Sequence, residues 1–296
     1  MKTPSPIQGV LSIDKPGGMS SHDVVNRLRR VCGIRRVGHA GTLDPLATGV
    51  LLVCVGRATR LVEYLVGQPK WYEATVRLGQ TTNTYDADGE IVAERPFFHI
   101  TPSQIAQELQ QFLGPIQQLP PMYSAIKKDG QPLYKLARQG IEIARDLRNV
   151  TIYEIELLDC TLPDVQLRVN CSTGTYIRSL AHDLGETLGC GGHIATLRRT
   201  AIGKFGVETA VSLNELTEDN FRQYLMPMDT AVSHLPRVDF ANAAAQQLLM
   251  GKLVDEPSAH AADTLVRAYD ESGTFLGVLL RRVENWQARK MFPTND

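Results

Sequence analysis

The segment Gly38-His-Ala-Gly-Thr-Leu-Asp-Pro-Leu-Ala-Thr-Gly49, with the apolar residues 50–55 directly after it, decides how this chain is organised. The apolar run has the length and composition of a buried strand. Glycines at positions 38, 41 and 49 indicate a loop before that strand, and Pro45 biases Asp44 toward an extended backbone. Such a loop can hold one carboxylate rigidly. Composition alone favours a purely structural turn, but loops on rigid scaffolds are also where chemistry concentrates.

Asp44 is the only acidic residue between Asp23 and Glu63, and many cations lie near it in the sequence. Cationic neighbours stabilise an ionised carboxylate, so we expect the pKa of Asp44 to be lowered, by about 1–3 units if one arginine makes close contact. An ionised carboxylate suits nucleophilic or electrostatic work better than general-acid work. A glycosidase of the usual kind needs a second carboxylate opposite the first, which only an acid remote in the sequence could supply.

Helices and strands are predicted on both sides of this loop. Hydrophobic periodicity and end signals place them at residues 10–13 (strand), 21–32 (helix, capped by Ser20 or Ser21 and ended by Gly33), 58–66 (helix), 72–78 (strand), 102–113 (helix, capped by Thr101), 150–158 and 165–170 (strands) and 177–188 (helix). Beyond the boundary-like segment 235–240, a short helix (241–250) and a hairpin (265–269 with 274–283) follow. The chain is therefore expected to be an α+β protein with a substantial sheet in residues 1–235 and a small β-rich module in 236–296.

The composition excludes several classes of protein. The 296 residues are 43% hydrophobic and 21% charged, and no apolar run approaches the ~18 residues of a membrane span. The N-terminal residues lack the pattern of a secretory signal, so we expect a cytoplasmic protein that does not contact a membrane. The five cysteines form no C-x-x-C pair and the seven histidines no H-x-x-x-H spacing, so neither a disulfide framework nor a metal site is expected.

The formal net charge of −1 hides separate blocks of charge. Residues 15–60 contain eight lysines and arginines against two aspartates, and residues 121–150 contain six against three acids. The segment 61–100 is acidic instead. Separated charge can attract a polyanion even to a neutral protein, although ordinary solvated helix faces would give the same count. For Lys127, Lys128, Arg138 and the pair Arg198–Arg199, phosphate contact and simple solubilising charge remain equally open.

A second candidate group of residues is Cys171-Ser-Thr-Gly-Thr-Tyr-Ile-Arg178, where a strand meets a helix. A helix N-terminus offers free N–H groups to an anion, and Arg178 adds a planar cation. The tyrosines at positions 72, 123, 134 and 176 are core candidates first, but one or two of them could stack on a base. His39 is the one histidine in a glycine-flanked loop.

Five motifs in this order resemble the TruB family of bacterial tRNA pseudouridine synthases. They are Asp14-Lys-Pro-Gly17, the loop Gly38–Gly49, Gly79-Gln-Thr-Thr-Asn-Thr-Tyr-Asp-Ala-Asp-Gly89, Pro120-Pro-Met-Tyr-Ser-Ala-Ile-Lys127 and Gly174-Thr-Tyr-Ile-Arg-Ser179. The resemblance covers roughly residues 9–235 and extends only loosely to the last 60 residues. It implies a pseudouridine synthase-like catalytic domain with a mixed, largely antiparallel sheet flanked by helices and loops, followed by a PUA-like RNA-binding module.

The same resemblance implies isomerisation of the uridine at position 55 in the T loop of tRNA. The expected partner is the T-arm stem-loop, no cofactor or metal is needed, and we expect a monomer. The implied roles are catalysis by Asp44, base stacking by Tyr72, pairing of Arg178 with Asp44, lining of the uracil pocket by Tyr176 and Leu197, and filling of the flipped nucleotide's place by His39.

For the RNA backbone, the resemblance implies that the basic segment of about 122–150 is a mobile element that closes on the RNA. Phosphate contacts are expected from Lys15, Lys127, Lys128 and Arg138. Thr173 stands where such sequences often carry Lys, which could remove one phosphate contact, and Asn83 where they often carry Asp.

The reaction breaks the N1–C1′ bond and joins C5 to C1′, so the base must first leave its stack. Asp44 could attack C1′, add to C6 or remove the 2′ proton, and the sequence does not choose among these routes. A non-catalytic tRNA-binding or RNA chaperone protein is the main alternative, because charge blocks and a β-rich module would serve it as well. A nucleoside-processing glycosidase is the third.

Overall fold

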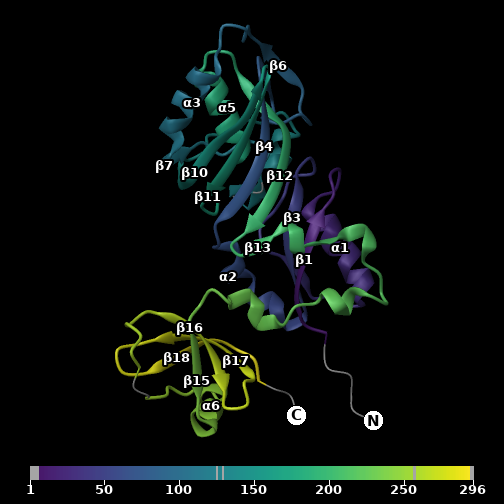
Figure 1. Ribbon diagram of the computed structural model, residues 1–296. Coiled ribbons are helices and arrows are strands. Elements are labelled where there is room, and N and C mark those ends of the chain that lie inside the picture. The colour runs from purple at the N-terminus through teal and green to yellow at the C-terminus, as the bar shows by residue number, and fades with distance from the viewer. Residues whose placement is uncertain (1–6, 125, 129, 256–257, 294–296) are drawn as a thin grey trace.

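The computed structural model describes residues 7–124, 126–128, 130–255 and 258–293, and within them one mixed sheet of ten strands forms the body of the protein (Figure 1). The strand order is β14-β1-β3-β12-β4-β11-β10-β7, with β2 paired to β3 and β13 to β12. The strands are β1 (Gly9–Lys15), β2 (Val37–His39), β3 (Thr48–Val55), β4 (Lys70–Leu78), β7 (Gly114–Gln118), β10 (Arg148–Thr161), β11 (Asp164–Cys171), β12 (Gly192–Ile202), β13 (Phe205–Gly206) and β14 (Val211–Ser212). Among the described strand pairs of this sheet, β1–β14 and β3–β12 are the parallel ones, which confirms the expected mixed, largely antiparallel sheet.

Two helices cover the sheet next to the Asp44 loop. Helix α1 (Ser21–Cys32) begins with a capping box between Ser20 and Asp23 and ends at Gly33, whose φ is +65°. Its apolar face packs on β1 and β3 in one of the core clusters. Helix α5 (Ile177–Thr187) covers the centre of the sheet and packs on β12 and β4 in another. Helix α1 supports the Asp44 loop, and helix α5 carries Arg178, which faces that loop.

The remaining helices are short. They are α2 (Val62–Val66), α3 (Pro102–Leu109) and α4 (Leu133–Ala137), with the 3-10 turns η1 (Gly56–Leu61), η2 (Gln110–Phe112), η3 (Val207–Thr209), η4 (Leu213–Glu215), η5 (Phe221–Tyr224) and η6 (Met228–Val232). The predicted helices 58–66 and 102–113 are each a 3-10 turn joined to a short α-helix. No helix in the described ranges is long and apolar enough to cross a membrane.

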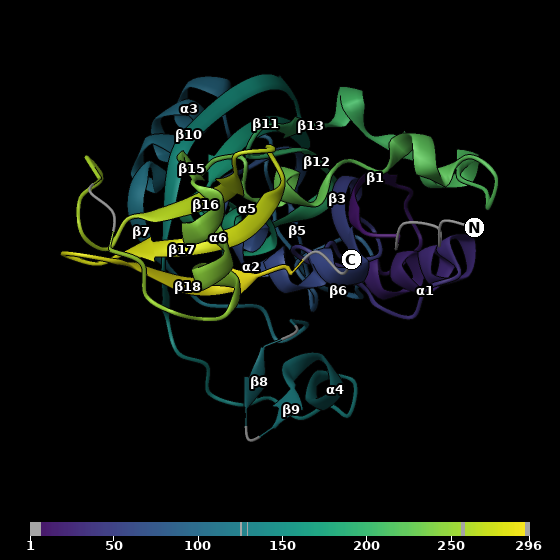
Figure 2. The same ribbon diagram turned by 90° about the horizontal axis from the view of Figure 1, so that it is seen from below.

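Two hairpins lie outside the main sheet. β5 (Gln80–Thr82) pairs with β6 (Ile91–Glu94), and β8 (Lys127–Lys128) pairs with β9 (Gln131–Pro132). Seen from below the sheet, β8, β9 and α4 project away from the body of the protein (Figure 2). Most of the basic segment of about 122–150 is therefore an arm attached to the body, and only its last residues, from Arg148 on, enter the sheet as the start of β10.

Strand β12 is the main element that the sequence did not reveal. It carries charged Arg199 at an inward-facing position, and its pairing with β4 shifts register between Ile194 and Thr196, so the apolar alternation expected of a strand is broken. Even so, β12 pairs with both β3 and β4 in the middle of the sheet. The short strand β2 also lies inside the predicted loop, and β7 was not foreseen either. The missing central strand matters because it carries two residues of the site described below.

The C-terminal residues form a four-stranded sheet with one helix: β15 (Arg237–Phe240), α6 (Asn242–Leu249), β16 (Leu265–Asp270), β17 (Phe275–Arg281) and β18 (Trp286–Met291). The predicted helix and hairpin are confirmed. This module packs against η1, where the guanidinium carbons of Arg57 and Arg60 lie 5.5 and 4.9 Å from the ring centre of buried Phe292. Two cations of the basic 15–60 segment thus hold the C-terminal module and are occupied in that contact.

Candidate active site

The loop that carries Asp44 is fixed at nearly every residue. The hydroxyl of Ser21, in the first turn of α1, accepts from the N–H of Leu43 at 2.8 Å and donates to its carbonyl at 3.0 Å. The carbonyl of Pro45 accepts from the N–H of Gly18 at 2.9 Å. The two residues beside Asp44 are therefore both tied to neighbouring elements, and the loop presents its carboxylate in one position.

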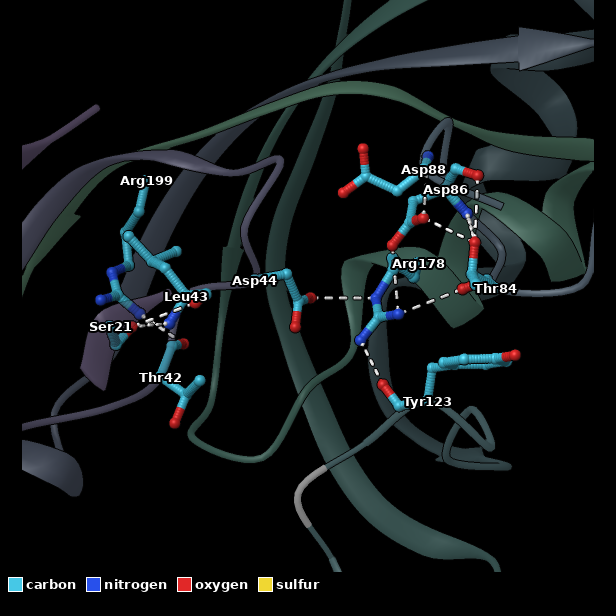
Figure 3. Close-up of polar contacts among 10 residues, drawn as sticks. All are labelled: Ser21, Thr42, Leu43, Asp44, Thr84, Asp86, Asp88, Tyr123, Arg178 and Arg199. Atoms are coloured by element: carbon cyan, nitrogen blue, oxygen red, sulfur yellow. Dashed lines mark hydrogen bonds and ion pairs between the residues drawn. The ribbon is translucent and has the colours of Figure 1, made fainter. Parts of the chain in front are cut away.

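Arg178, in the first turn of α5, faces that carboxylate (Figure 3). Its Nε lies 3.0 Å from Oδ2 of Asp44, and its Nη1 lies 3.1 Å from Oδ2 of Asp86. Two carbonyls complete its contacts: that of Thr84 accepts from Nη1 at 3.1 Å and that of Tyr123 from Nη2 at 2.8 Å. The Arg178 side chain is only 5% exposed, so its guanidinium is held with every nitrogen engaged.

The pKa of Asp44 is the first point at which the structure corrects the sequence. Burial raises the pKa of this carboxyl above its ordinary value, and the charge of Arg178 acts in the opposite direction with a smaller effect. The Asp44 side chain is still 37% exposed, because it lines a cavity. Most of its surroundings are nevertheless protein atoms rather than water. The close arginine was predicted correctly; the expected net lowering of the pKa was wrong, since the loss of water outweighs the ion pair.

Asp44 and Arg178 lie where two cavities meet. The smaller has a volume of about 260 Å³, and its wall includes Tyr72, Tyr176 and Leu197. The larger, of about 770 Å³, opens beside it and is lined by His39 and Arg138 among others. The structure thus brings together all the residues that the sequence assigned to base binding, from four different elements. A planar ring in the smaller cavity would lie against both Tyr72 and the carboxylate of Asp44.

Each wall residue of the smaller cavity is held by its strand or helix end. Tyr72 on β4 is 7% exposed and Leu197 on β12 is 8% exposed, and the two belong to the same core cluster. Burial raises the pKa of the Tyr72 hydroxyl, which keeps it protonated at neutral pH. Tyr176 caps α5, and its N–H donates to Oε1 of Gln118 at 2.9 Å. These contacts make the cavity a preformed part of the fold.

His39 lies at the end of β2, on the wall of the larger cavity. Burial lowers the pKa of its imidazole, so the ring is neutral at physiological pH. Its Nδ1 is buried and has no hydrogen-bond partner among the described residues. A neutral, half-buried ring at the edge of this cavity suits contact with a base or a ribose rather than with a phosphate.

Of the four predicted phosphate-binding cations, Lys15 is wrongly assigned. Its side chain is completely buried, and its Nζ donates to the carbonyls of Pro16 and Met19 at 2.8 and 2.7 Å. Lys128 and Arg138 are exposed on the projecting arm, where Arg138 lies over the ring of Tyr134. The side chain of Lys127 lies outside the described residues. Lys15 thus supports the Asp44 loop from inside the protein, where its Nζ also lies 3.4 Å from the carbonyl oxygen of Pro45. Of these four predicted cations, Lys128 and Arg138 are the ones that the described residues show exposed to a ligand.

Comparison with known proteins decides the family. The model of the TruB family pseudouridylate synthase N-terminal domain matches residues 29–177, and that of the tRNA pseudouridylate synthase B C-terminal domain matches residues 178–233. This chain belongs to the TruB family. The tRNA pseudouridine synthase B of Clostridium kluyveri is 42% identical over 97% of this chain and 100% of its own, and that of Aromatoleum aromaticum is 46% identical over 92% and 88%.

Solved structures agree with this membership. An H/ACA RNP bound to a substrate RNA containing 2′-deoxyuridine is similar at a TM-score of 0.76 and 27% identity, covering 97% of this chain and 86% of that one. A Cbf5-Nop10-Gar1 complex is similar at 0.75 and 30%, covering 96% and 84%. The expected pseudouridine synthase-like fold is thereby confirmed, and the TruB-family protein described here is an enzyme of that class.

Three residues of this TruB-family site were missed from the sequence. Asp86 lies inside the quoted motif 79–89 but was given no role, and it is the second carboxylate beside Arg178. Ser21 was considered only as a helix cap. Arg199 was considered only as a surface cation, but it is 1% exposed. The order of motifs could have suggested Asp86, whereas nothing local distinguishes Arg199 from its exposed neighbour Arg198.

Asp86 also bears on the glycosidase alternative. A remote acid does approach Asp44, but its side chain is 7% exposed and its two oxygens are already bound. Oδ1 accepts from the hydroxyl of Thr84 at 2.6 Å and from the N–H of Asp88 at 3.2 Å, while Oδ2 binds Arg178. A carboxylate held in this way is not placed to serve as the general acid of a glycosidase.

Proposed function

We propose that this protein isomerises uridine to pseudouridine at position 55 in the T loop of tRNA, with Asp44 as the catalytic residue. The membership in the TruB family and the names of the relatives support the reaction and the RNA class. The observation that carries the proposal is the position of one carboxylate, bound to Arg178 and lining the same cavity as Tyr72. A cavity of about 260 Å³ is the size for one base removed from its stack.

In this proposal, the flipped uracil lies on the ring of Tyr72, with Leu197 and Tyr176 at its edges. The carboxylate of Asp44 then reaches the ribose or the base, through attack at C1′, addition at C6 or removal of the 2′ proton. Arg178 keeps that carboxylate oriented and favours its ionised form against the effect of burial. The N1–C1′ bond breaks, the uracil turns within the cavity, and C5 bonds to C1′ with release of the proton from C5. No cofactor enters this sequence of steps.

The larger cavity beside Asp44 is assigned to the nucleotides around the flipped one. Its volume is about three times that of the smaller, and it extends to Arg138 and Tyr134 of the projecting arm. We propose that the arm closes over the T-arm with Lys128 and Arg138 at phosphates, and that residues 236–296 add a second RNA contact. We further propose that the protein acts as a monomer on cytoplasmic tRNA.

The test is Asp44→Asn, which keeps the shape of the side chain but removes its charge. With tRNA that contains 5-tritiated uridine, the wild type should release tritium in an amount equal to the pseudouridine mapped at position 55. Asp44→Asn should release none above background, while its Kd for tRNA stays within about threefold, because phosphate contacts dominate affinity. The matched control is Asp164→Asn, whose carboxylate lies in a half-exposed pair with Arg77.

Other outcomes point to the alternatives. Free uracil among the products would indicate a glycosidase. A tRNA that is returned chemically unchanged by the wild type, but refolds faster in its presence, would indicate an RNA chaperone. Tritium release at near-normal rate by Asp44→Asn would remove Asp44 from the chemistry.

A further inference from the structure

Arg199, on β12, is a buried cation that the function proposed above does not yet use. It is 1% exposed, and no ion pair in the described part of the chain involves it. Its guanidinium donates to three backbone carbonyls: Nε to Val50 at 2.7 Å, Nη2 to Gly41 at 3.1 Å and Nη1 to Thr42 at 3.4 Å. It also interacts with the hydroxyl of Tyr72, on the wall of the smaller cavity. A buried charge without a carboxylate partner among the described residues is costly, so we explain its position by what its carbonyl acceptors hold.

The three acceptors flank Asp44 in the sequence. Gly41 and Thr42 precede it, and Val50 begins the buried part of β3 after it, so one planar group closes the loop on itself. Ser21 binds Leu43 from the side of α1, as Figure 3 shows. The loop is therefore fixed from two sides, by Ser21 on helix α1 and by Arg199 on strand β12.

The backbone of Arg199 makes a second contact with the same loop. Residues 198 and 199 of β12 pair with Thr48 and Gly49 of β3. Gly49 has a φ of +100°, and a Cβ at this position would lie within 2.2 Å of the carbonyl oxygen of Arg199. Only glycine allows this close approach. Backbone and side chain of Arg199 thus act on both ends of the Asp44 loop.

We propose that Arg199 is a positioning residue for Asp44, which sets the loop 41–50 so that the carboxylate meets Arg178 and the cavity. It acts on the loop because each of its three guanidinium nitrogens donates to a carbonyl of the loop or of β3, and it reaches the smaller cavity only at its contact with Tyr72. A lysine could not replace it, since one ammonium cannot reach three carbonyls in the plane of a guanidinium. The kinetic part of this inference rests on the proposed function; the structural part does not.

The experiment compares Arg199→Lys with Arg198→Lys, the same change at adjacent positions. Arg198 is 39% exposed and bonds to Asp14 and Thr48 at the surface. Hydrogen–deuterium exchange, followed by mass spectrometry, is measured on peptides that cover residues 41–50. The single-turnover rate of pseudouridine formation and the Kd for tRNA are measured on the same preparations, with folding checked by near-UV circular dichroism.

For Arg199→Lys, we expect exchange in residues 41–50 to increase at least tenfold while peptides from β10 and β11 are unchanged. The single-turnover rate should fall by about 10²-fold, the effect of a displacement near 1 Å of a reacting group. The Kd for tRNA should change less than threefold, and Arg198→Lys should match the wild type in all three measurements. If Arg199→Lys does not fold, Arg199→Gln, which keeps a planar donor without charge, is used with Arg198→Gln.

The exchange measurement decides the inference even if the wild type forms no pseudouridine. Unchanged exchange in residues 41–50 would overturn it. A weaker Kd with an unchanged rate would also overturn it, because Arg199 would then be a phosphate contact. If the loss of rate is fully explained by the fraction of unfolded protein in the sample, Arg199 stabilises the fold in general and does not position Asp44.

Discussion

Arg178 Nη1 and Asp86 Oδ2 lie 3.1 Å apart, and both side chains are almost fully buried, at 5% and 7% exposed. The arginine that pairs with Asp44 therefore has a second carboxylate partner that is almost completely shielded from solvent. Two carboxylates and one guanidinium leave one negative charge, and the more exposed carboxylate, Asp44, is the one that faces the cavities. This arrangement fixes the arginine while leaving the charge of Asp44 available to a substrate.

The first prediction concerns Asp86→Asn. The amide keeps the shape of the side chain but leaves Arg178 with one carboxylate instead of two. We expect the free energy of unfolding to fall by about 1–3 kcal/mol, because a buried charge loses a charged partner but keeps two carbonyls and Asp44. Urea denaturation followed by circular dichroism measures it. Asp164→Asn, in a half-exposed pair, should cost less than about 1 kcal/mol; equal costs for the two variants would contradict the role assigned to Asp86.

The second prediction concerns the wall of the smaller cavity. Tyr72→Ala should remove measurable turnover, because the flipped base loses the surface that orients it against Asp44. Its Kd for tRNA should rise by no more than about 10²-fold, since one stacking contact contributes only ~1–3 kcal/mol. Tyr72→Phe keeps the ring and should retain the affinity of the wild type. A collapse of tRNA affinity in the alanine variant, with loss of near-UV signal, would show that Tyr72 is needed mainly for the core.

The third prediction concerns the projecting arm. Replacing Lys128 and Arg138 with alanine should reduce the slope of log K against log salt by about one to two units if both side chains meet phosphates. Filter binding between 50 and 200 mM salt gives the slope. Arg168→Gln is the control, because Arg168 pairs with Glu73 and Glu156, and alternation along β4 places Glu73 on the face opposite Tyr72. An unchanged slope in the double variant would assign both cations to ordinary solvation.

The fourth prediction concerns pH. Burial lowers the pKa of Lys70 from its ordinary 10.5 to about 8, and the Nζ of Lys70 donates to the carbonyls of Val66 and Gln68. Between these two values the unfolded chain binds a proton that the folded protein has already lost. The free energy of unfolding therefore rises with pH between about 8 and 10.5 on account of Lys70. Below pH 8 both states hold the proton, so Lys70 adds no pH dependence there.

Lys70→Met removes that contribution. The unfolding free energy of the wild type minus that of Lys70→Met should increase by roughly 3 kcal/mol between pH 8 and 10.5, as a shift of this size requires. Urea denaturation at three pH values in this range checks it. Lys252→Met, at an exposed lysine, should show no such trend. A difference that falls with pH would mean that Lys70 is charged and compensated in the folded protein.

The sequence by itself determined the local structure and the family. The capping box of Ser20 and Asp23, the glycine after α1 and the glycine–proline loop around Asp44 depend on residues a few positions apart, so their signals are complete within a short segment. Five ordered motifs were enough to identify the family and the residues that line the smaller cavity. The partnership of Arg178 with Asp44 came from that resemblance, because the two positions are far apart along the chain.

The tertiary structure decided which charges are inside. Arg198 and Arg199 are neighbours in the same strand, but alternation turns one to the surface and the other into the protein, and β12 itself was hidden because its apolar alternation is broken. Lys15 likewise belongs to a basic segment by sequence and to the interior by structure. Burial depends on which distant strands pair, and it sets both the cost of a charge and the pKa of Asp44. Counting charges along the chain therefore indicated a polyanionic partner, while only the folded sheet separated the exposed cations that could meet RNA from the buried ones that hold the Asp44 loop.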